Sequence, residues 1–158
     1  MTSTVVAPRQ GTPAKAAMSS SRVPPQDLHA ELCLLGSILL KPDVIDLLPG
    51  EMSPTDCYGP DHVDALKAAL EVRSQGRMPD ATELYAKLQP AMGARAEELL
   101  NEAMEKVPHS AGWRGYAQII RRMAMRRAVI AAGQDLMRGG WDEHTELDDV
   151  IAQGETAL

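Results

Sequence analysis

Two histidines and two cysteines form the one group of side chains in this sequence that we weigh as a metal site. His29 and Cys33 are four residues apart, so a helix would place both on one face. Cys57 and His62 could then complete a tetrahedral zinc site. Structural zinc sites more often use closely spaced pairs in loops, and a cysteine beside a row of leucines behaves as a small hydrophobic residue. We therefore favour a buried thiol and two ordinary histidines, and we assign no metal site.

Four arginines within seven residues could bind phosphate groups. Their charge would contact a nucleic-acid backbone, and Trp113 or Tyr116 would stack on bases. The whole chain carries a formal net charge of −6 at pH 7, which opposes that interpretation. We favour a solvent-exposed face or a surface that binds protein. The four residues are Arg121, Arg122, Arg126 and Arg127.

The common motifs for nucleotide binding and nucleophilic catalysis are absent from the sequence. It has no GxxxxGK[ST] phosphate loop, no GxGxxG and no HExxH. No serine, histidine and acid stand in a recognisable nucleophile motif. We therefore expect no catalytic residues and no cofactor-binding residues in this chain.

The composition favours a helical protein of the cytoplasm. Ala, Leu and Met outnumber Val, Ile and Thr by about two to one, which favours helix over sheet. The longest apolar run, 32–40, is too short to cross a bilayer. Two cysteines make no disulfide framework, and no signal-peptide stretch opens the chain, so a reducing compartment is expected.

Helix signals recur along the first two thirds of the chain, and no strand pattern does. Asp27 can cap a helix whose leucines at 28, 32, 35 and 39 form one stripe. A proline is expected to end a later helix at Pro90, and another at Pro108. Further helices are expected over 44–48, 61–74, 81–89 and 93–107, with Asp80 capping the third of these.

A long helix and a shorter return helix are expected at the C-terminal end. Ser110 can cap the long helix, which spans about 112–138. Gly139-Gly140 then breaks it, and Thr145 caps a last segment over 146–158.

Charge is divided between these two helices. Six arginines and one acid lie between residues 114 and 138, whereas six acids and no Lys or Arg lie from residue 141 onward. Opposite charges on two neighbouring helices would fix their antiparallel pairing. The same arginines therefore have a structural interpretation that competes with nucleic-acid binding.

The order of several motifs resembles the N-terminal domain of DnaB-type bacterial replicative DNA helicases. The segment beginning at Val23, VPPQDLHAELCLLGSILLKPDVIDLL, looks like the opening of that domain. SPTDCYGPDHVDAL, GRMPDATELYAKL and VPHSAGWRGYAQIIRRMAMRRAVI follow in the family's order, so the resemblance covers about residues 23–155. Cys57 stands where the family usually has Phe.

The resemblance implies an all-α fold, with a compact bundle of about six helices plus a C-terminal helical hairpin. We therefore expect a flexible tail over 1–22, a helical bundle over 23–108, and a helical hairpin over 109–158. The hairpin's return arm would stop before the linker and motor domain that follow in family members. Either Met1 or Met18 could be the start of the protein.

The implied function is that of a non-catalytic collar domain of a bacterial or phage-encoded replicative helicase. Such domains pair through their hairpins and bind the helicase-binding domain of primase or a helicase loader, with DNA involved only indirectly and no membrane. ATP and Mg are expected only in a downstream motor domain. The candidate surface for self-association or partner binding consists of Tyr116, Ile119, Ile120, Met123, Arg126, Arg127 and Ile130.

Two other functions fit the same residues. The first is a standalone helical adaptor that modulates the assembly of a helicase or primase. The size of the endogenous protein separates the two, because a collar domain would belong to a species several times heavier than 17.1 kDa. The second is a weak binder of single-stranded nucleic acid through the arginine-rich helix.

A mobility-shift assay with a labelled single-stranded oligonucleotide tests the last of these functions. We expect no shift even at low salt, because the net charge of −6 opposes phosphate binding. A shift that weakens steeply as salt is added would instead support nucleic-acid binding.

Overall fold

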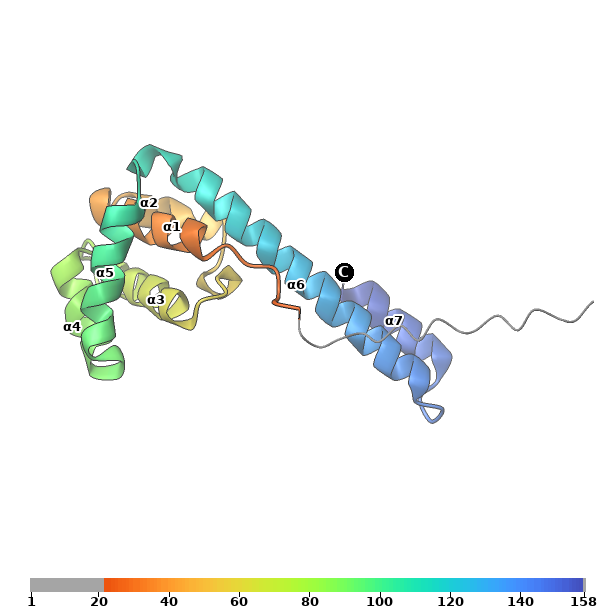
Figure 1. Cartoon of the computed structure of the whole chain (residues 1–158). Coiled ribbons are helices and arrows are strands. Elements are labelled where there is room, and N and C mark those ends of the chain that lie inside the picture. The colour runs from red at the N-terminus through yellow and green to blue at the C-terminus, as the bar shows by residue number, and fades with distance from the viewer. Residues whose placement is uncertain (1–21, 158) are drawn as a thin grey trace, which may run out of the picture.

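The structure is a computed structural model that describes residues 22–157, and its regular elements there are all helical (Figure 1). The expected all-α fold is confirmed, whereas the expected tail lies outside the described residues except at Arg22. None of the described helices is long and apolar enough to span a membrane. The helices are α1 (Leu28–Leu40), α2 (Val44–Leu47), α3 (Pro60–Ser74), α4 (Ala81–Met92), α5 (Ala94–Lys106), α6 (Trp113–Trp141) and α7 (Leu147–Ala157), with 3-10 turns at Leu48–Gly50, Pro54–Asp56 and Ser110–Gly112.

A bundle and a projecting hairpin share one long helix. Helix α1 packs against α3, α5 and α6, and α4 covers α3 and α5 (Figure 1). Helix α6 begins in the bundle, where Trp113, Ala117 and Ile120 are buried in the core. It then extends beyond the bundle, and α7 packs antiparallel against its outer half (Figure 1). The expected bundle with a C-terminal hairpin is therefore present.

Helix α1 is central because it is apolar on nearly all sides. The Asp27 side chain caps it as expected, accepting a hydrogen bond from the Ala30 amide at 2.9 Å. Leu32 and Leu35 of the expected stripe are buried, and so are Leu34 and Ile38 on other faces. A helix that is hydrophobic all round is buried, so one stripe understates its role.

A glycine allows α1 and α5 to approach closely. A Cβ atom added to Gly36 would lie only 2.1 Å from the carbonyl oxygen of Ala103. Because that neighbour is backbone, no side-chain rotation could make room. The contact between these two helices therefore depends on the absence of a side chain at residue 36.

Two helices continue past residues that were expected to end them. Helix α4 contains Pro90 and ends at Met92, and the following C-cap residue, Gly93, has a positive φ of 59°. Proline near the end of a helix removes only one amide donor, so the last turn persists. Helix α6 continues through Gly139 and Gly140 to Trp141, because packing against α7 stabilises this stretch.

Two expected caps are also wrong. The His109 ring, and not Ser110, caps the turn before α6, since its Nδ1 accepts a hydrogen bond from the Gly112 amide at 3.2 Å. The Thr145 hydroxyl donates to the Asp142 carboxylate at 2.7 Å, and so it stabilises the connecting turn between α6 and α7.

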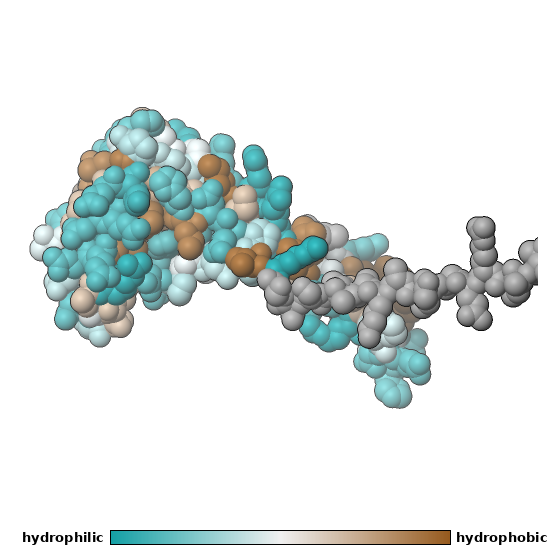
Figure 2. All heavy atoms as spheres, viewed as in Figure 1, coloured by the Kyte–Doolittle hydropathy of each residue, from teal (hydrophilic) through white to brown (hydrophobic). Residues whose placement is uncertain are grey.

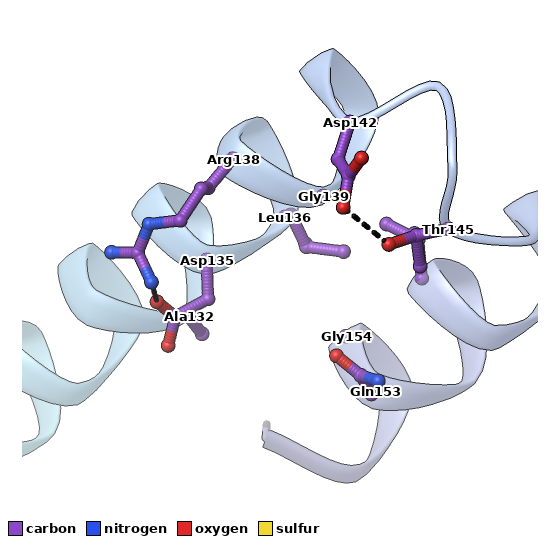
Figure 3. A pocket seen from close by; sticks show the side chains of 10 residues that line it. Ala132, Asp135, Leu136, Arg138, Gly139, Asp142, Thr145, Gln153 and Gly154 are labelled. Carbon is purple, nitrogen blue, oxygen red and sulfur yellow. Dashed lines mark hydrogen bonds and ion pairs between the residues drawn. The ribbon is translucent and has the colours of Figure 1, made fainter.

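Small residues hold the hairpin together (Figure 3). A Cβ atom on Gly139 would lie 2.9 Å from Val150, and one on Gly154 would lie 2.4 Å from Leu136. The two helices therefore pack closely at the glycines, and a cavity of about 430 Å³ remains between them.

Opposite charges do not join the two helices of the hairpin. Within residues 22–157, no ion pair connects α6 to α7, and Arg138 pairs with Asp135 of its own helix at 3.1 Å (Figure 3). The expectation that charge fixes the pairing is therefore wrong for the described contacts. The close fit of glycines against aliphatic side chains takes that role.

A Gly36→Ala substitution should destabilise the protein by about 3 kcal/mol, because α1 or α5 must move to accommodate the methyl group. The matched control is Gly115→Ala, whose Cβ would meet open space. It should stabilise by up to about 1 kcal/mol through helix propensity. Urea denaturation of both variants measures the difference, and equal effects would contradict the close contact.

Candidate functional site

The side chains considered as metal ligands make other contacts. Cys33 Sγ lies 3.5 Å from His29 Nε2 and also 3.5 Å from the Lys106 carbonyl oxygen. Burial raises the pKa of both the Cys33 and the Cys57 thiols, so neither forms a thiolate at neutral pH. Across residues 22–157, no group of three or more His, Cys, Asp or Glu side chains could hold a metal ion.

The fourth of those residues, His62, belongs to a buried hydrogen-bonded pair with Glu31. Its Nδ1 lies 2.6 Å from a carboxylate oxygen of Glu31, whose side chain is only 2% exposed. The same carboxylate accepts hydrogen bonds from the amides of Tyr58 at 2.7 Å and Gly59 at 3.0 Å. Glu31 therefore ties the loop before α3 to the central helix α1.

This polar centre was missed by the sequence analysis. Glu31 was an acid in the first turn of a helix, where such residues are common and exposed. The available signal was its position between Ala30 and Leu32, in a helix that is otherwise nearly all apolar. An acid inside such a run needs buried donors.

Hydrogen bonds keep Glu31 charged. Burial by itself raises the pKa of this carboxyl, but the hydrogen bonds from His62 and from the amides of Tyr58 and Gly59 outweigh burial. The net effect lowers the pKa below its ordinary value of 4.5. Glu31 is therefore ionised at neutral pH and accepts all three donors.

Arg127 bonds to its own chain. Its guanidinium donates to the Pro25 carbonyl at 2.8 Å and to the Asp56 carbonyl at 2.5 Å. It also lies 5.7 Å from the centre of the Tyr58 ring, which is a favourable cation–π distance. Arg127, expected on the contact surface, is therefore engaged inside the molecule.

Two further arginines tie α6 to the bundle. Arg121 donates to the Glu51 carbonyl at 3.3 Å, and Arg114 pairs with the Glu51 carboxylate at 3.3 Å. In contrast, Arg122 and Arg126 are exposed and form no ion pair with any residue of the described part. The arginine cluster thus divides into structural members and members that face solvent.

The first candidate contact residues on α6 lie against the bundle. Ile120 is only 1% exposed and belongs to the core, so its expected place on a contact surface is wrong. Tyr116 and Ile119 are half-buried and pack against that core. Helix α6 buries this face because it lies directly over α1.

The later candidates lie where α6 leaves the bundle. Met123 is half-buried and Arg126 is exposed, whereas Ile130 is 47% exposed. Arg126 and Ile130 line a groove of about 400 Å³ together with Pro25, Met125 and Val129. Figure 2 shows hydrophobic atoms beside hydrophilic ones where the bundle gives way to the hairpin.

Exposed apolar side chains continue along the hairpin on both helices. Six of the exposed apolar side chains of the hairpin, which include the 84%-exposed Trp141, were not part of the expected surface. Apolar patches on a protein surface commonly mark binding sites for other proteins. We call the following set the hairpin surface: Met125, Val129, Ile130, Met137 and Trp141 of α6, with Leu147 and Ile151 of α7.

A family model and individual relatives of known sequence match this chain and agree with each other. The sequence-family model described as the DnaB-like helicase N-terminal domain matches residues 23–122 of this chain. The replicative DNA helicase DnaB of Leifsonia xyli subsp. xyli is 32% identical over 89% of this chain and 31% of that protein. The replicative DNA helicase DnaC of Bacillus subtilis is 26% identical over 88% of this chain and 31% of that protein. The chain thus spans about a third of the length of these relatives.

A solved structure has the same fold. The N-terminal domain of DnaB helicase from Mycobacterium tuberculosis superposes with a TM-score of 0.76 at 29% sequence identity. The match covers 85% of this chain and 97% of that structure.

A Glu31→Gln substitution should destabilise the protein by about 2–3 kcal/mol at pH 7, since it removes a charged acceptor of three buried donors. Because the pKa of Glu31 is lowered, its contribution is present above pH 4.5 and is lost as pH falls through the folded-state value. The difference from wild type should therefore shrink near pH 3. Urea denaturation at both pH values measures it, with the exposed Glu105→Gln as control. A difference that is the same at both pH values would contradict this account.

Proposed function

The chain belongs to the family of DnaB-like helicase N-terminal domains, and from this premise we propose that it is a non-catalytic collar domain that joins copies of itself through the hairpin. The sequence has no phosphate loop, so we assign ATP hydrolysis, and the Mg that accompanies it, to a motor domain outside this chain.

The exposed hairpin surface is the observation that carries this proposal. Along α6, Ile119, Met123, Ile130 and Met137 are spaced four, seven and seven residues apart, so they lie along one seam on the surface of the helix. This seam becomes more exposed with distance from the bundle, from half-buried at Ile119 to 48% exposed at Met137. Burying it against another helix would remove apolar area from water.

The charges beside the hairpin surface complement each other. Arg122 and Arg126 flank the groove on α6, while Asp148 and Glu155 lie near the exposed Ile151 on α7. If α7 of a second copy lies on the groove of the first, basic and acidic rims meet twice by symmetry. We therefore infer a pair in which each copy contributes both helices.

We further propose that the paired domains bind the helicase-binding domain of primase or a helicase loader, in the cytoplasm of a bacterium or a phage-infected cell. The family supports this proposal, as do the exposed aromatic and methionine side chains of the hairpin, which are enriched at protein interfaces. DNA would then be contacted only indirectly.

An Ile130→Asp substitution should weaken self-association at least about tenfold, because a charge would be buried in the paired surface. The matched control is Leu47→Asp on α2, whose side chain is similarly exposed at 50% but lies on the bundle. Light scattering over a range of concentrations gives the mass of each variant.

The outcomes of this experiment are distinct. A wild-type mass that rises with concentration, with Leu47→Asp like wild type and Ile130→Asp at the monomer mass, supports pairing through the hairpin. A wild-type mass that stays at the monomer value, or equal behaviour of both variants, contradicts it.

A further inference from the structure

Three distant segments of the chain meet at the Arg127 side chain. Its two terminal nitrogens donate to the main-chain carbonyls of Pro25, 102 residues away, and Asp56, 71 residues away. The Tyr58 ring lies beside the same guanidinium. Arg127 thus connects α6 to the segment before α1 and to the loop before α3.

Both carbonyl acceptors, those of Pro25 and Asp56, belong to segments that other contacts hold against the bundle. Glu31 holds the loop through the amides of Tyr58 and Gly59, the residues that follow Asp56 and Cys57. Pro25 lies two residues before Asp27, which caps α1. The carbonyls that receive the Arg127 hydrogen bonds are therefore held by the central helix of the bundle.

Arg127 lies on the part of α6 that has already left the bundle core. Ile120 is the last residue of α6 that is buried in the bundle core, and the next buried residue, Ala132, faces α7. Arg127 lies about 10 Å beyond Ile120 along the helix, and Trp141 lies about 21 Å farther on. A small change of angle at Arg127 would therefore move the tip of the hairpin by a large distance.

We propose that Arg127 locks the angle between the hairpin and the bundle. Its planar guanidinium meets two carbonyls at once, which a single ammonium group on a flexible stem does not reproduce. When the lock is broken, the hairpin swings relative to the bundle while both remain helical. The role of this lock in pairing rests on the proposed function, because the angle sets the direction in which the hairpin surface faces a second copy.

Distances between two spin labels on the same chain, measured by double electron–electron resonance, test directly whether Arg127 fixes the angle. Spin labels at Gln89→Cys on α4 and Gln134→Cys on α6 use exposed positions, whereas the native Cys33 and Cys57 are buried. An excess of unlabelled protein restricts the signal to distances within one chain. The variants are Arg127→Gln and Arg127→Lys, and the neighbouring, exposed Arg126→Gln is the control.

The lock predicts one narrow distance distribution for wild type and Arg126→Gln. Arg127→Gln should give a distribution about twice as wide, as expected for hinge motion, and Arg127→Lys should lie between the two. Circular dichroism must show unchanged helix content. If Arg127→Gln does not fold, Arg127→Lys and Tyr58→Leu supply the comparison, and Tyr58→Leu keeps the main-chain bond to Glu31.

A distribution for the Arg127 variants as narrow as that for Arg126→Gln would overturn the lock, because core packing at Ile120 would then suffice to fix the angle. This result is independent of self-association. A wild-type chain that stays monomeric contradicts the proposed function, whereas the spin distances still decide whether Arg127 fixes the hairpin.

Discussion

One buried carboxylate supports the part of the molecule on which the rest depends. Ionised side chains are expensive to bury unless they are well hydrogen-bonded, and Glu31 accepts hydrogen bonds from one imidazole and two amides. Those donors fix the loop whose Asp56 carbonyl receives Arg127. The position of the longest helix, and of the hairpin surface that it carries, is therefore linked to a charge inside the central helix.

Local signals in the sequence were sufficient for most helices and insufficient for the contacts between them. Caps such as Asp27 and Asp80 act within three residues, so the sequence predicts them correctly. The Glu31–His62 pair joins residues 31 apart, and no periodicity reveals it. Gly139 indicates a helix end by propensity, yet it lies inside α6 because α7 packs on it.

The candidate surface shows the same division. Ile130 and Arg126 lie on an exposed groove, in agreement with their place in the apolar and basic pattern of α6. Ile120 and Arg127 belong to the same pattern, but one is covered by the bundle and the other is bonded to it. The sequence pattern identifies the apolar face of α6. How far along the helix the bundle covers that face depends on tertiary packing, which the pattern does not contain.

The shared helix α6 gives the molecule a gradient of stability along one continuous rod. Its first turns are buried with Trp113 and Ala117, and its last turns are supported by α7 alone. We therefore expect amide hydrogens near Ala117 to exchange more slowly with solvent than those near Trp141. The first turns of α6 also complete the bundle core, so their removal would leave a destabilising void beside α1. The bundle and the hairpin thus share one helix, and the least supported end of that helix is the end that projects into solvent.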